Sequence, residues 1–117
     1  MHKFKELRVW QQSVEVSAKV YNLTKKFPRE ELFGLTSQMR RAAISIASNI
    51  AEGAGRNSPK EFYNFLGIAN GSSSELQTQL IIAKRLGYLT QQEENNINGD
   101  LKAIGNMIFK LQKSLSK

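Results

Sequence analysis

The feature that most constrains the fold is the spacing of the apolar residues, which recur at alternating intervals of four and three in four segments. Because an α-helix makes one turn in about 3.6 residues, this spacing places the apolar side chains along one side of a helix. No segment shows the strict apolar and polar alternation that indicates a strand. The pattern predicts an all-α protein with helices at about 6–26, 36–53, 59–86 and 91–115.

Residues that start or stop helices stand between these segments. Pro28 ends the first segment, because proline lacks an amide hydrogen and restricts the residue before it. The runs Ser58–Glu61 and Thr90–Glu93 each combine an N-cap hydroxyl with a glutamate three residues later, which is the capping-box pattern. We expect Gly53 and Gly55 to adopt the left-handed conformation that caps the second helix.

The apolar positions also predict which helices pack together. Read in opposite directions along successive helices, they match position for position, as antiparallel helices crossing at about 20° require. A chain of 117 residues has room for one core, so we expect a single domain, 1–117. The predicted fold class is an antiparallel up-down-up-down four-helix bundle. Its layers would be Trp10, Ile50, Phe62 and Leu115; Val14, Ile46, Leu66 and Leu111; Ser17, Ala43, Ala69 and Ile108; and Tyr21, Met39, Ser73 and Ile104.

The first helix carries a second apolar stripe, more than a quarter turn from the one assigned to the core. One monomeric bundle cannot bury both stripes, and an aligned apolar stripe on a surface indicates an interface. We therefore predict a homo-oligomer that buries this side of the first helix. The predicted interface residues are Val9, Val16, Val20, Leu23 and Phe27.

The chain carries 17 Lys and Arg against 10 Asp and Glu, a formal net charge of +7, which favours anionic partners such as nucleic acid. A basic surface that only confers solubility is the alternative. The first and fourth helices are neighbours in the predicted topology, so their outward basic residues could form one face. We expect phosphate contacts rather than base stacking, because no aromatics are interleaved with the lysines. The candidates are Arg8, Lys19, Lys26, Lys102, Lys110 and Lys113, with Lys117 extending the series.

A polar motif lies on the second helix among small residues. It consists of Arg40, Arg41, Asn49 and Glu52, with Glu75 on the third helix as the expected ion-pair partner of Arg40 or Arg41. We favour a structural role for Arg41, Asn49 and Glu52 over phosphate binding, and both roles stay open for Arg40.

The residue types in the chain give little support for a catalytic function. The chain has no Cys and a single His, His2, close to the terminus. The carboxylate pairs Glu30–Glu31 and Glu93–Glu94 stand at helix starts, where negative charge stabilises the helix dipole. We expect no enzyme, metal, cofactor or small-molecule substrate. The lack of Cys and of any stretch of about 20 apolar residues predicts a cytoplasmic protein without membrane contact.

Several segments together resemble a known family. They are Leu7 with Trp10, FPREELFGLTSQMRRAAISIASNIAEGAGR, EFYNFLGIANGSSSEL and the Leu-Gly-Tyr-Leu at 86–89, over about residues 4–112. The chain is similar to the bacterial four-helix-bundle proteins encoded by intervening sequences inside 23S ribosomal RNA genes. This resemblance implies a barrel-like homopentamer. It also implies kinship with the accessory protein of diversity-generating retroelements, a basic pentamer that binds a reverse transcriptase and nucleic acid.

Three functional hypotheses follow. The first is a non-catalytic oligomeric scaffold that binds RNA or DNA phosphates. The second is an adaptor for an acidic protein partner or for a nucleic-acid enzyme such as a reverse transcriptase. The third is a structural protein without a ligand, whose charges only confer solubility.

Overall fold

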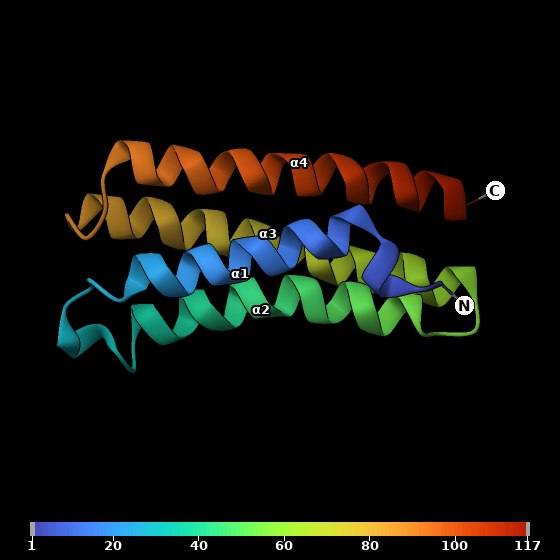
Figure 1. The fold of residues 1–117 in the computed structure, drawn as a ribbon, viewed down its shortest axis with the longest axis horizontal. Coiled ribbons are helices and arrows are strands. Elements are labelled where there is room, and N and C mark those ends of the chain that lie inside the picture. The colour runs from blue at the N-terminus through green and yellow to red at the C-terminus, as the bar shows by residue number, and fades with distance from the viewer. Residues whose placement is uncertain (1, 117) are drawn as a thin grey trace.

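Four long helices form an antiparallel bundle in the computed structural model, which describes residues 2–116 (Figure 1). They are α1 (Arg8–Thr24), α2 (Leu35–Ala54), α3 (Pro59–Arg85) and α4 (Gln91–Leu115), with short 3-10 helices η1 (Phe4–Glu6) and η2 (Arg29–Glu31) before α1 and α2. Both termini lie at the end of the bundle that holds the α2–α3 connection. The predicted all-α fold with four helices is confirmed, and no strand occurs within residues 2–116.

The starts of α3 and α4 follow the predicted capping chemistry. The Glu61 backbone N–H donates to the Ser58 hydroxyl at 3.1 Å, and Pro59 occupies the first turn. At α4 the Glu93 N–H donates to Thr90 Oγ1 at 3.1 Å while the Thr90 N–H donates to Glu93 Oε1 at 2.9 Å. These bonds satisfy amide groups that have no partner inside the helix, so both helices begin where the sequence predicts.

The end of α2 differs from the prediction. Gly53 lies inside the helix, and Gly55 has an ordinary right-handed conformation with φ of −82°. Within residues 2–116 the left-handed region is occupied by Gly87 alone, with φ of 82°, in the turn between α3 and α4. The expectation of left-handed caps at Gly53 and Gly55 was therefore wrong. Gly53 is needed for another reason, because α3 packs directly against it.

The core positions of α2, α3 and α4 are those that the apolar spacing predicts. Leu111 and Leu115 of the predicted layers are half-buried at the edge of the core, and the remaining positions are buried. These buried positions are Met39, Ala43, Ile46 and Ile50 on α2; Phe62, Leu66, Ala69 and Ser73 on α3; and Ile104 and Ile108 on α4.

The orientation of α1 is the main correction. The helix is rotated by one residue relative to the prediction, so that Val9, Val16 and Val20 enter the core while Val14 and Tyr21 are about 40% exposed. Ser13 also enters the core, because its hydroxyl donates to the Val9 carbonyl at 2.7 Å and needs no other partner. Trp10 and Ser17 lie at the edge of the core rather than in it.

The stripe that was expected to form an oligomer interface therefore belongs to the core of a single chain. Val9, Val16, Val20 and Phe27 are buried there, and Leu23 is half-buried against them. A side chain buried inside its own bundle cannot contact a second copy, so the interface assignment was wrong for the four buried residues, while Leu23 keeps a partly exposed side chain. The surplus apolar stripe of α1 is the other one, which includes Val14 and Tyr21.

Candidate functional site

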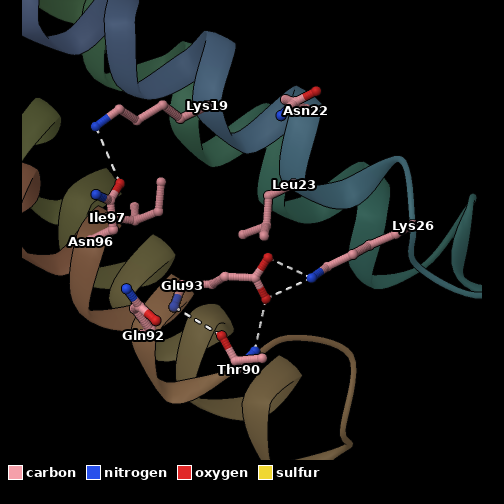
Figure 2. A pocket seen from close by; sticks show the side chains of 9 residues that line it. All are labelled: Lys19, Asn22, Leu23, Lys26, Thr90, Gln92, Glu93, Asn96 and Ile97. Carbon is pink, nitrogen blue, oxygen red and sulfur yellow. Dashed lines mark hydrogen bonds and ion pairs between the residues drawn. The ribbon is translucent and has the colours of Figure 1, made fainter.

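A surface groove of about 460 Å³ separates the last turns of α1 from the first turns of α4 (Figure 2). Lys19 of α1 and Lys26, two residues after the end of α1, reach across it to side chains of α4. The Lys19 ammonium donates to Asp100 Oδ2 at 2.7 Å and to Asn96 Oδ1 at 3.2 Å. The Lys26 ammonium bonds both carboxylate oxygens of Glu93. The groove is thus bridged by ion pairs along its length.

These contacts involve Lys19 and Lys26, two of the residues predicted to bind nucleic acid. A lysine whose charge is compensated by a carboxylate at hydrogen-bond distance attracts a phosphate less than an uncompensated one. Lys19 and Lys26 therefore hold α1 against α4. The structure assigns them an interhelical contact, and phosphate binding at these two positions stays a prediction.

Glu93 is the central group of this contact. Its carboxylate caps α4 through the Thr90 N–H and accepts hydrogen bonds from Lys26. The hydrogen bond from Lys26 first, and then the one from the Thr90 backbone, lower the pKa of Glu93 below its ordinary value of 4.5. The predicted helix-start role of this glutamate is extended, because the same side chain also links α4 to α1.

Of the other cationic candidates, Lys102 lies near the middle of α4 and the rest lie towards the opposite end of the bundle. Lys102, Lys110 and Lys113 on α4 and Arg8 on α1 are exposed. None of them joins an ion pair within residues 2–116. The Lys19–Asp100 and Lys26–Glu93 contacts set an antiparallel register that brings Arg8 level with the last turns of α4. Lys117 lies outside the described residues.

The charge pattern of α4 explains why these lysines stay unpaired. Its acidic residues, Glu93, Glu94 and Asp100, all fall in its first half, and no Asp or Glu follows Asp100 in the chain. The first half therefore binds the lysines of α1, while the second half leaves its own lysines to solvent. Within residues 2–116, the candidates without a carboxylate partner are Arg8, Lys102, Lys110 and Lys113.

The polar motif on α2 divides into two contact sets. Arg40 turns towards α1, where its Nε donates to Thr24 Oγ1 at 2.9 Å and its guanidinium lies 4.5 Å from the centre of the Tyr21 ring. The expected pairing of Arg40 with Glu75 was therefore wrong. Arg41 and Glu75 line one shallow depression of about 280 Å³, but they form no ion pair within residues 2–116.

Asn49 and Glu52 make local contacts. The Asn49 amide donates to the Ser45 carbonyl at 2.8 Å and to its hydroxyl at 3.0 Å, and that hydroxyl lies 2.8 Å from the hydroxyl of Ser72 on α3. Glu52 accepts from Arg56 at 2.9 Å, one turn later. Asn49 thus supports the α2–α3 contact through Ser45, which is the structural role favoured from the sequence.

Two exposed aromatic residues were missed by the sequence reasoning. Phe109 on α4 is 66% exposed and Tyr63 on α3 is 41% exposed. The available signal was the helical spacing, since Phe109 follows Lys102 by seven residues and precedes Lys113 by four. Residues at such spacings share one side of a helix, so an aromatic is in fact interleaved with the lysines of α4.

Other functional classes have less to build on in residues 2–116. No cluster of three or more His, Cys, Asp or Glu residues in that range could hold a metal ion. The ring of His2 packs edge-on against buried Phe62, with 4.9 Å between the ring centres. Of the helices described, none combines the length and the hydropathy needed to cross a membrane.

Comparisons with known proteins agree with this architecture. Residues 5–110 match the family model described as 23S rRNA-intervening sequence protein. Among solved structures, the chain is similar to a protein of unknown function from the S23 ribosomal protein family of Bacteroides thetaiotaomicron. The two share 29% sequence identity and a TM-score of 0.83 over 90% of this chain and 95% of the other. A search of curated proteins finds no match.

Proposed function

The chain belongs to the 23S rRNA-intervening sequence protein family, and we propose that it is a non-catalytic module that binds the phosphates of RNA or DNA. The observation that carries this proposal is the charge of α4 after Asp100. Lys102, Lys110 and Lys113 are exposed there, and no acidic residue follows Asp100 in the sequence. Arg8 adds a further positive charge at the same end of the bundle.

Lysines in this arrangement bind nucleic acid mainly by releasing the cations condensed on the phosphates. Such binding is weak for one subunit, with a dissociation constant of about 10⁻⁴ to 10⁻⁶ M, and it falls steeply as the salt concentration rises. Several subunits in one assembly would strengthen it through simultaneous contacts. The proposal therefore predicts a steep salt dependence rather than high affinity.

The test compares two variants that lose the same number of charges. One is Lys110→Gln with Lys113→Gln, at positions without a carboxylate partner. The other is Lys19→Gln with Lys26→Gln, at positions that pair with Asp100 and Glu93. Binding to fluorescent RNA and DNA oligonucleotides is measured by polarisation over a range of salt concentrations.

We expect the first variant to bind more weakly, with a salt slope smaller by about one for each lysine that no longer meets a phosphate. The second variant should bind almost as the natural chain does, although its net charge is equal. Equally weakened binding in both variants would show that only total charge matters, and the proposed site would be rejected. Absence of binding by the natural chain would favour the adaptor role, with an acidic protein or a reverse transcriptase as partner.

Self-association into a ring, a homopentamer, is the second part of this proposal. It is supported by the outward stripe of α1, where Val14 and Tyr21 are about 40% exposed, and by Ile44 on α2, which is 42% exposed. Trp10 extends the stripe and packs edge-on against Phe4. Light scattering should give a mass several times that of one chain, and Val14→Asp should reduce it. A natural chain that is monomeric at micromolar concentration would refute this part.

A further inference from the structure

The outward side of α4 combines an aromatic ring with two cations. Lys102, Phe109 and Lys113 follow each other at spacings of seven and four, so they lie in one row along the helix. At 1.5 Å per residue this row extends over about 16 Å. Phe109 is 66% exposed, so most of its ring is open to solvent.

The neighbouring helix adds a second ring and a third cation. Tyr63 on α3 is 41% exposed, and Lys60 precedes it by one turn. The Gln112 amide of α4 donates to the Tyr63 carbonyl at 3.1 Å, so the turn of α4 that follows Phe109 lies against Tyr63. Phe109 and Tyr63 are therefore offset by about one helical turn on adjacent helices, whose axes in such bundles lie about 8–10 Å apart.

Two glycines lie along this face, one turn from each ring. Gly67 follows Tyr63 and Gly105 precedes Phe109, and added β-carbons would meet their nearest neighbours only at 3.7 and 3.9 Å, both of which are ordinary contact distances. Packing between the helices therefore does not require glycine at these positions. Phe109 and Tyr63 remain 66% and 41% exposed, so both rings are accessible to a flat ligand.

This face also lacks negative charge. The sequence of α3 holds no acidic residue between Glu61 and Glu75, and α4 holds none after Asp100. A surface that carries lysines without acids repels a second identical surface, whereas it attracts a polyanion. The combination of open aromatic rings and uncompensated lysines is the one used by proteins that bind single-stranded nucleic acids.

We propose that the α3–α4 face binds single-stranded nucleic acid, with Phe109 and Tyr63 stacking on bases and with Lys60, Lys102 and Lys113 contacting phosphates. This inference rests on the proposed function and specifies its ligand. A duplex hides the faces of its bases, so it can use the lysines but not the rings. Stacking on an aromatic side chain changes affinity by about 5- to 150-fold for each base.

The experiment uses the full chain with Phe109→Ala, and Phe33→Ala serves as the matched control. Phe33 is 94% exposed, but it lies in the α1–α2 connection, at the bundle end opposite the C-terminus of α4 (Figure 1). Affinities are measured for a single-stranded oligonucleotide and for the duplex of the same sequence, both as RNA and as DNA. Phe109→Trp is included because it keeps a stacking surface.

We expect Phe109→Ala to weaken single-strand binding by at least 5-fold and to leave duplex binding unchanged. Phe33→Ala should change neither, and Phe109→Trp should retain the single-strand preference. An unchanged ratio of single-strand to duplex affinity in Phe109→Ala would overturn this inference. The phosphate-binding proposal would still stand if Lys110→Gln with Lys113→Gln weakened both ligands.

Light scattering tests the other explanation for the exposed ring, namely that Phe109 contacts a second copy of the chain. The molecular mass of Phe109→Ala should equal that of the natural protein at the same concentration. A lower mass would make the α3–α4 face an interface between copies and would overturn the inference. Circular dichroism of the same sample verifies that the helices are intact.

Discussion

Gly53 allows α2 and α3 to approach closely, and Gly53→Ala tests this contact. An added β-carbon would lie 2.6 Å from the β-carbon of Phe65 and 3.0 Å from Cδ1 of Phe62. Phe62 is 1% exposed, and the β-carbon of Phe65 is held by its backbone, so neither contact is relieved by a simple side-chain rotation into solvent. Such overpacking costs about 1–3 kcal/mol, while alanine in place of glycine within a helix recovers about 0.5–1 kcal/mol. We expect a net loss of about 1–2 kcal/mol in the free energy of unfolding.

Gly71→Ala is the control for this prediction. Gly71 lies within α3, is exposed, and has no atom within 4 Å of an added β-carbon, so this change should stabilise the chain by about 0.5–1 kcal/mol. Urea unfolding followed by circular dichroism at one protein concentration measures both variants. With a slope of about 1–3 kcal/mol per molar urea, the two midpoints should differ by about 1 M. A midpoint for Gly53→Ala equal to or above that of Gly71→Ala would refute the close-contact argument.

Further predictions concern the orientation of α1, the ion pairs and the α3–α4 turn. Val16→Asp should unfold the chain because it buries a charge, whereas Val14→Asp should leave the helical circular dichroism unchanged; the reverse result would restore the predicted helix phase. The lowered pKa of Glu93 gives stability that is present above its ordinary value of 4.5 and lost as the pH falls through the lower folded value. Acid unfolding should therefore be less steep in Glu93→Gln, and an unchanged acid transition would contradict the contact with Lys26. Gly87→Ala should cost about 1 kcal/mol in thermal unfolding because of its φ of 82°, and an unchanged melting temperature would argue against that conformation.

The sequence was sufficient for the helices and for three of the four core faces. On α2, α3 and α4 one apolar stripe clearly dominates, and the polar positions fall elsewhere. The capping residues Ser58 and Thr90 then define the starts of α3 and α4, because their hydroxyls bind backbone amides that have no other partner. These features depend on local chemistry, which a single sequence contains.

The phase of α1 could not be decided in the same way. Its two stripes have the same spacing, and each contains a serine, Ser13 or Ser17. The structure buries Ser13 without penalty because the hydroxyl bonds back to its own helix, while Trp10 and Tyr21 pack at the edge against Phe4 and Arg40. A usable signal was the length of the buried stripe, which continues in phase to Phe27.

The candidate site was predicted only in part. Charge counts identify the lysines, but they do not show which ones meet a carboxylate across an interhelical groove. Lys19 and Lys110 look equivalent in the sequence, yet Lys19 lies 2.7 Å from Asp100 while Lys110 has no ion-pair partner within residues 2–116. That difference arises from the antiparallel register of α1 and α4, which is a property of the assembled bundle.

The lysines of the groove are bridged to carboxylates, whereas those of the later turns of α4 are not. Positive charge is therefore unevenly distributed along the length of the protein. The electric field of a polyanion would then orient the molecule before contact, so that the end with both termini approaches first. Copies arranged around a rotation axis parallel to the helices would all present this pole to the same side. Such an assembly would gather the lysines that follow Asp100 from every copy on one side, and a strand captured by one copy would lie within reach of the next.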